Sequence, residues 1–238
     1  MGVINLLYKR EYPITDKIKI MIPTVGEVIE HEEEYYQLVS ALTAVPFDMM
    51  VQLDDIGVDF TKIDEYELFL VLFNGLRNND THLIFGDLSI QNFETVVNTK
   101  TDQVVLYDRE NDIIIDQGIQ NQIASTIRRI NHLEKTIKKA GNDEARDYLI
   151  KRERMKMKRR KNRTQFSQLE QLIVAMVNTE QFKYGYEEVR DLTIYQFQES
   201  VHQIISKVDY DNLMGGIYAG TVKASEISQD RLNWISHN

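Results

Sequence analysis

Residues 103–130 read QVVLYDRENDIIIDQGIQNQIASTIRRI, and the hydrophobic period changes half-way along this stretch. The first half holds two short β-rich runs, 103–107 and 112–116, separated by a polar turn at 108–111, and this pattern predicts antiparallel strands. From residue 117 onward isoleucine recurs every three to four positions, which predicts an amphipathic helix. The stretch therefore predicts an α+β fold in which strands lead directly into helix.

Toward the N-terminus, two further β-rich runs at 82–86 and 93–97 extend the strand pattern. Together the four runs predict a small antiparallel β-meander over about residues 82–116. Because a few short strands are unstable alone in water, we expect the meander to pack on helices.

An alternating polar and apolar pattern at 17–22 predicts a half-buried strand that Pro23 ends. Thr24 follows with Glu27 three positions later, which is the arrangement of a capping box. We expect a helix from this point to about Thr43.

Two more helices are predicted before the meander. A short one runs from Pro46 through Leu53 and is ended by Gly57, and a longer one runs over about 62–76. The three prolines all lie in the first fifth of the chain, so proline does not interrupt helix anywhere after residue 46. The prediction is accordingly an α+β fold that is mostly α.

Beyond the meander, the pattern predicts a long antiparallel helical hairpin over about residues 117–163. Gly141 suits the left-handed position after a helix, and Asn142 suits the N-cap of the next one, so the expected turn is tight. Ile137 is expected on the apolar face of the first helix.

Helical spacing resumes at 166–177 and again at 189–208, with Gly185 between the two segments. The glycines at 215, 216 and 220 predict a turn or a close helix contact. We expect a single compact domain, 1–238, with an acidic helical and meander part, 1–116, and a helical part, 117–238, that carries the projecting basic hairpin.

The charge of the chain is strongly segregated. The stretch Lys151–Arg163, KRERMKMKRRKNR, has nine basic residues, one acid and a net charge of +8. Without it, the chain has 19 basic and 36 acidic residues, a net of −17. Residues 24–67 alone hold twelve acids and one base, a net of −11. Segregated charge favours complementary docking.

The basic block has three open interpretations: a solvated helix face, a surface that docks on acidic protein, or a nucleic-acid site on the helix 146–163. The acidic protein surface includes the region 27–67 of this chain or of another copy. No aromatic residue lies within the block, so the nucleic-acid alternative lacks a stacking platform. The predicted partner-binding residues are Lys151, Arg152, Arg154, Lys156, Lys158, Arg159, Arg160, Lys161 and Arg163.

Catalytic motifs are missing from the sequence. The chain has no cysteine, which excludes disulfides, thiolate metal sites and cysteine nucleophiles. His31 lies among glutamates without a second histidine at helical ligand spacing, so we interpret it as part of a solvated acidic face. We expect no enzyme activity, no metal and no cofactor.

An apolar content of 42% predicts a folded core. The longest apolar run, 68–73, is far shorter than the ~20 residues that cross a bilayer. We expect a soluble intracellular protein that makes no membrane contact.

Several phrases resemble proteins from the tail-morphogenesis regions of tailed bacteriophages that infect Gram-positive hosts. They are Leu83–Leu88, Val105–Asp108, Ile113–Asp116, Phe182–Tyr186, Asp191–Ser200, Gly216–Gly220 and Leu232–Ile235. The resemblance extends over most of the chain from residue 17. It implies a non-enzymatic tail or baseplate assembly protein, either an assembly chaperone or a minor structural subunit. The implied partners are other tail or baseplate proteins or a second copy. The implied location is the host cytoplasm during assembly or the virion tail.

Overall fold

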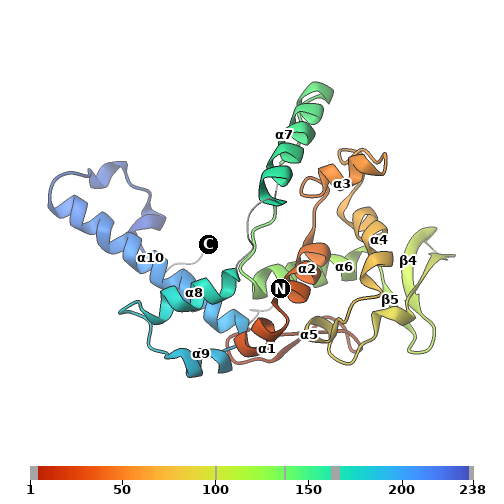
Figure 1. The fold of residues 1–238 in the computed structure, drawn as a ribbon, viewed down its shortest axis with the longest axis horizontal. Coiled ribbons are helices and arrows are strands. Elements are labelled where there is room, and N and C mark those ends of the chain that lie inside the picture. The colour runs from red at the N-terminus through yellow and green to blue at the C-terminus, as the bar shows by residue number, and fades with distance from the viewer. Residues whose placement is uncertain (1–4, 100, 137, 162–166, 236–238) are drawn as a thin grey trace.

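The computed structural model describes residues 5–99, 101–136, 138–161 and 167–235. Within these ranges the chain is mostly helical, with one two-stranded and one three-stranded antiparallel sheet (Figure 1). The predicted class, α+β and mostly α, is confirmed. In the described ranges, no helix combines the length and the apolar character needed to cross a membrane.

The elements follow one another in this order, where η marks a 3₁₀-helix: β1 (Glu11–Pro13), β2 (Lys19–Met21), α1 (Val25–Glu30), α2 (Glu32–Thr43), α3 (Met50–Asp55), α4 (Glu65–Leu76), α5 (His82–Phe85), η1 (Ile90–Asn92), β3 (Glu94–Asn98), β4 (Gln103–Asp108), β5 (Ile113–Ile115), α6 (Gln117–Ile130), α7 (Asp143–Lys161), α8 (Gln168–Val177), α9 (Tyr186–Asp191), α10 (Ile194–Tyr218), η2 (Ala224–Glu226) and η3 (Gln229–Leu232).

The strand predicted at 17–22 is present as β2, which pairs with β1 so that Tyr12 faces Ile20. After it, the predicted capping box forms. The Thr24 hydroxyl accepts from the Glu27 amide, and the Glu27 carboxylate accepts from the Thr24 amide. The helix predicted to follow as one piece is divided into α1 and α2 at His31, whose φ of −134° is not helical.

The helices predicted near 46–57 and 62–76 correspond to α3 and α4. Gly57 adopts a φ of +74° after α3, as expected of a residue that ends a helix. Asp64 caps α4 and forms a capping box with Glu67. Both helices start a few residues later than the sequence suggested: Pro46 to Met49 form a turn before α3, and Asp64 is the N-cap of α4.

The predicted meander is confirmed over three of its four runs. Strands β3, β4 and β5 lie in sequence order, and Leu106 pairs with both Thr95 and Ile115. It packs on helix as expected, since the Tyr66 hydroxyl on α4 donates to the Ile115 carbonyl at 2.8 Å.

The fourth run, 82–86, was predicted as a strand, and this prediction is wrong: it forms α5 and then Gly86. A strand would direct Ile84 and Phe85 to opposite faces of a sheet. Both side chains are buried in the main core, which one helical turn allows.

The predicted helical hairpin, 117–163, is only partly correct. Its two helices exist as α6 and α7, but α6 already ends at Ile130, and residues 131–142 connect them without helix where described. Helix α6 packs on α2 and α4, whereas α7 packs on α3 and projects from the body (Figure 1). The two helices therefore do not pair as a tight hairpin.

His132 explains why α6 stops early. Its φ is +50°, the Leu133 amide donates to the Arg128 carbonyl at 2.8 Å, and the His132 amide donates to that of Arg129 at 3.4 Å. This is the Schellman arrangement that ends a helix. The left-handed backbone conformation predicted for Gly141 is thus adopted by His132, and Gly141 has no positive φ.

The predicted N-cap Asn142 is confirmed, since its side chain accepts from the Ala145 amide. Ile137 lies outside the described residues.

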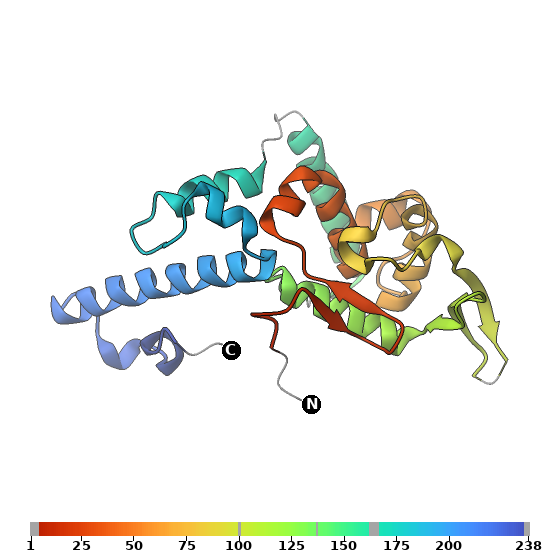
Figure 2. The same cartoon turned by 90° about the horizontal axis from the view of Figure 1, so that it is seen from below.

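In the C-terminal part, the long helix predicted from 189 is divided into α9 and α10, and Thr193 caps α10. Helix α10 extends away from the body in Figures 1 and 2, and the chain then folds back along it. Arg231 pairs with Asp209 at 2.9 Å in this return. Gly215 and Gly216, predicted near a turn, lie within the helix. The predicted turn instead follows the helix at Gly220, whose φ is +75°.

Two buried apolar clusters hold these elements together. The main cluster draws residues from Leu6 to Val201 and lies around α2 and α6. The smaller one joins α3 and α4 to α7 through Phe60, Leu68 and Ile150. Since burial of apolar surface is the main stabilising term in folding, the small cluster decides where α7 is held.

Candidate interaction surface

Helix α7 carries most of the basic block. Six of the nine predicted partner-binding residues have described side chains: Lys151, Arg152, Arg154, Lys156, Lys158 and Arg159. The helix includes Arg160 and Lys161, but their side chains, together with Arg163, lie outside what the structure describes. The six cations do not share one environment, since the two sides of the helix have different neighbours.

The inner side of α7 packs on α3. Ile150 is buried to 8% exposure, and Leu149 and Met157 pack beside it against the small cluster. One turn further along, the Arg154 guanidinium reaches α3 itself.

Arg154 is neutralised within the fold. Its Nη2 lies 2.6 Å from both Asp54 Oδ2 and Asp55 Oδ1. The hydrogen bond to Asp54, and to a smaller extent the one to Asp55, raises the pKa of the Arg154 guanidinium. Arg154 therefore binds α7 to α3 and is not available to an outside partner without breaking that contact.

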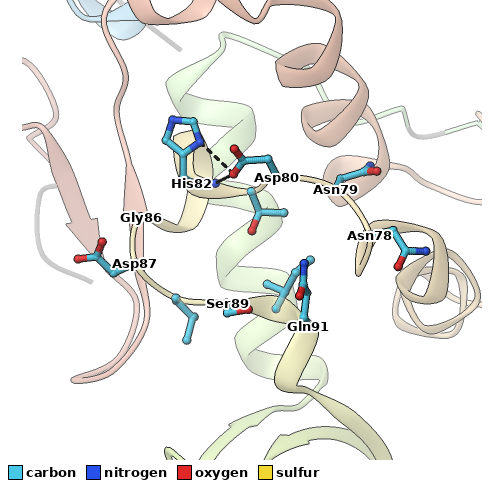
Figure 3. Close-up of a pocket in the computed structure, with 11 residues that line it drawn as sticks. Asn78, Asn79, Asp80, His82, Gly86, Asp87, Ser89 and Gln91 are labelled. Atoms are coloured by element: carbon cyan, nitrogen blue, oxygen red, sulfur yellow. Dashed lines mark hydrogen bonds and ion pairs between the residues drawn. The ribbon is translucent and has the colours of Figure 1, made fainter.

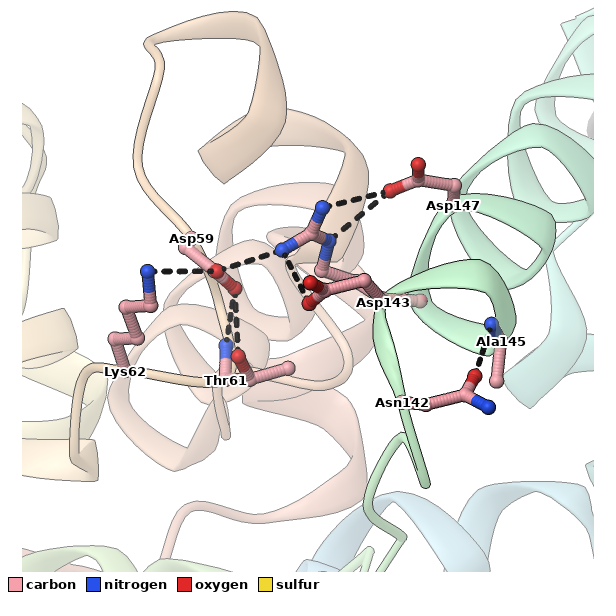
Figure 4. Close-up of polar contacts among 8 residues, drawn as sticks. Asp59, Thr61, Lys62, Asn142, Asp143, Ala145 and Asp147 are labelled. Carbon is pink, nitrogen blue, oxygen red and sulfur yellow. Dashed lines mark hydrogen bonds and ion pairs between the residues drawn. The ribbon is translucent and has the colours of Figure 1, made fainter.

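A second ionic contact holds the first turn of α7 (Figure 4). Arg146 Nη1 lies 2.9 Å from Asp59 Oδ2, and its other contacts are to Asp143 and Asp147 of its own helix. Hydrogen bonds from the Thr61 hydroxyl and amide, with the nearby Arg146 charge, lower the pKa of Asp59 to about 2. Asp59 is therefore ionised in the folded protein at neutral pH.

Half of the acids in the region 24–67 form ion pairs within the fold. Its ion pairs and capping contacts are Glu27 with Arg10, Glu30 with Arg190, Asp54 and Asp55 with Arg154, Asp59 with Arg146, Glu65 with Arg128 and Lys135, and Asp64 with Glu67 around the start of α4. Six of the twelve acids are therefore paired with cations of the same chain, and Asp64 and Glu67 accept from each other's backbone amides, which the sequence pattern did not reveal.

The outer side of α7 has a different character. Lys151, Lys158 and Arg159 are exposed and make no ion pair with any residue in the described ranges. Arg152 lies 5.9 Å from the centre of the Tyr148 ring, a cation–π contact. Tyr148 is 63% exposed and Met155 is 49% exposed. This side combines uncompensated cations with apolar surface, and it is the candidate interaction surface.

A polar hollow of about 410 Å³ lies elsewhere, between residues 78–82, which follow α4, and residues 86–91 (Figure 3). Its lining includes Asn78, Asp80, His82 and Gln91. Asp80 accepts from the His82 backbone and ring, which lowers the pKa of the Asp80 carboxyl. The His82 ring points toward Asp80 and away from Ser89, so these residues do not form a nucleophile–base pair.

In the part of the chain that the structure describes, no group of three or more histidine, aspartate or glutamate side chains converges as metal ligands would. His31, interpreted as part of a solvated face, is exposed, and its ring meets that of His82 at 6.1 Å. His132 pairs with Glu199 at 3.2 Å and stacks on Tyr195, which joins the end of α6 to α10.

Comparison with known protein families points to a phage-related protein. Residues 158–238 match the family model described as the YomV second domain, and YomV is a phage-region protein of Bacillus. The match starts in the last turn of α7 and takes in α8, α9 and α10, about a third of the chain. No curated protein and no solved structure matches the chain. The phage part of the predicted resemblance is therefore supported.

Proposed function

We propose that this phage-related chain is a non-enzymatic assembly protein of the tail or baseplate, acting through protein–protein contacts. The observation that carries the proposal is the outer side of α7, where Lys151, Lys158 and Arg159 have no ion-pair partner among the described residues, on a helix that projects from the body. An uncompensated charged face gives fast and oriented encounter with a partner of opposite charge.

The C-terminal match supports the phage setting of this proposal, and the resemblance of the sequence to tail-morphogenesis proteins supplies the tail or baseplate role. In this role the chain acts in the host cytoplasm during assembly, or stays in the virion tail. Its partners are other tail or baseplate proteins.

The test is a deletion of the coding sequence in the phage or prophage that carries it, followed by electron microscopy of the particles. We expect heads without complete tails, and rescue when the wild-type chain is supplied in trans. Rescue should fail with Lys151, Lys158 and Arg159 all changed to glutamine. A matched triple change at the exposed Lys9, Lys183 and Lys223 should rescue, because it removes equal charge away from α7.

Complete, infective tails in the deletion would rule out the assembly role. Purified chain that shifts DNA or RNA at near-physiological salt, and loses this binding in the α7 triple variant, would favour the nucleic-acid alternative instead, because binding to phosphates depends on such cations.

A further inference from the structure

The exposed side of α7 has a regular pattern beyond its charge. Tyr148, Arg152, Met155 and Arg159 follow at intervals of four, three and four residues. A helix turns by about 100° per residue around its axis. Measured around that axis, all four side chains lie within about 40° of the direction opposite Ile150, the buried residue that anchors the helix. They form a stripe of about 16 Å, at about 1.5 Å per residue, in which apolar and cationic side chains alternate. We call it the outer stripe.

Carboxylates are kept away from the outer stripe. Between residues 148 and 159 the sole acid is Glu153, which pairs with Lys156 at 3.0 Å. Lys151 and Lys158 lie along one flank of the stripe, both exposed. A partner that covers the stripe thus meets positive charge along its whole length.

We propose that the outer stripe is the docking face for an acidic amphipathic helix of another protein. This inference rests on the proposed function and names the chemistry of its partner. Side chains three and four apart on such a helix pack over Tyr148 and Met155. Its flanking glutamates or aspartates meet Arg152, Arg159 and the two lysines, which gives charge complementarity.

Two other occupants fit the stripe less well. A second copy would have to offer acidic surface, and six of the twelve acids in 24–67 are already ion-paired within their own chain. A nucleic acid would place phosphates against the Met155 side chain, and the remainder of the chain, at −17, repels it.

The stripe is preorganised for a protein partner. The contact of Arg152 with Tyr148 holds an aromatic ring and a guanidinium together on the surface before binding. Residues of these two types are enriched among those that contribute most at protein interfaces. Since α7 is fixed to α3 by Arg154 and Ile150, the stripe is presented on a rigid helix.

The probe is a synthetic helical peptide of about 18 residues, roughly five turns, with leucines on one face and glutamates on its flanks. Calorimetry should detect its binding to the full chain, weaker at high salt because the contacts are exposed. Tyr148→Ala with Met155→Ala should weaken the affinity by about tenfold or more, equivalent to about 1.4 kcal/mol. The triple glutamine variant at 151, 158 and 159 should weaken it similarly.

The matched control is Tyr8→Ala with Tyr218→Ala, which removes two exposed rings from other surfaces and should leave the affinity unchanged. A peptide of the same composition in scrambled order should bind weakly. Equal binding of the scrambled peptide, no binding of the patterned one, or unchanged affinity in the Tyr148/Met155 variant would each overturn the proposal. So would preferred binding of a DNA duplex or a stripe-dependent dimer in sedimentation.

The failure of this inference can be told from the failure of the assembly role. If the deletion blocks tail formation but the Tyr148/Met155 variant restores it, the outer stripe is not the docking face and the assembly role stands. If tails form without the protein, the assembly role fails, and the peptide measurement still decides the chemistry of the stripe.

Discussion

Thr24 and Thr193 face each other in an isolated antiparallel bridge that joins the first turns of two helices distant in sequence. The Val25 amide donates to the Leu192 carbonyl and the Ile194 amide to the Pro23 carbonyl, both at 2.8 Å. Each threonine also closes a capping box at the start of its own helix. The bridge therefore connects the N-terminal strands to the start of α10.

Replacing Thr193 by alanine should destabilise the protein by about 1 kcal/mol, the usual cost of losing an N-cap side chain. The part-buried backbone amide of Gln196 then loses the hydroxyl that accepts from it. Urea unfolding measures the change. Thr193→Ser keeps the hydroxyl and should recover most of the stability, and an alanine variant as stable as wild type would contradict the role of the cap.

Gly86 should tolerate no side chain. Its φ of +60° and ψ of −128° are rarely adopted by other residues, and an added Cβ would lie 3.2 Å from the Met21 sulfur. We expect Gly86→Ala to cost about 1–3 kcal/mol of unfolding free energy. Gly141→Ala is the control, because Gly141 has open space around it and no positive φ. Equal stabilities of the two variants would disprove the argument.

Arg154→Gln should loosen α7 from α3. Because the ion pairs with Asp54 and Asp55 are partly exposed, the cost in global stability should be small. Hydrogen exchange of the α7 amides is the more sensitive measurement and should accelerate. Lys156→Gln, whose partner Glu153 lies on the same helix, should leave the exchange unchanged. The same exchange rates in both variants would show that the ion pairs do not hold α7.

Acid should release the first turn of α7. The pKa of Asp59 falls from its ordinary 3.8 to about 2 in the folded chain, so its contribution to stability is complete above about pH 4. The contribution is lost as the pH falls through 2, where the folded carboxyl becomes protonated. Hydrogen exchange at residues 143–147 should therefore accelerate over this range. Asp59→Asn should remove that part of the acid dependence, and an unchanged profile would refute the assignment.

Local patterns predicted several features of the fold correctly. The capping box of Thr24, the N-cap Asn142 and the strands at 93–116 depend on neighbours in sequence, and all three are present. The run at 82–86 was misassigned because a short apolar segment has no periodicity that separates strand from buried helix. The early stop of α6 depends on His132, whose left-handed backbone is accompanied by contacts with Tyr195 and Glu199 far along the chain.

The candidate surface was predictable only in part. The sequence located the cationic helix, but not which cations are available, because Arg154 finds its carboxylates a hundred residues away. Tyr148 lies just outside the basic block and on the same side of the helix as Met155, so a charge pattern along the linear sequence does not include it. The partner-binding role of the block stays a prediction.

The YomV-like segment, 158–238, shares its interior with the remainder of the chain. Ile194, Phe197 and Val201 are buried in the main cluster together with residues as distant as Leu6 and Ile18. A fragment cut at residue 158 would expose this apolar surface to water, so it should aggregate when expressed alone. The match to the family model thus begins inside a region whose apolar core is shared with the residues before it.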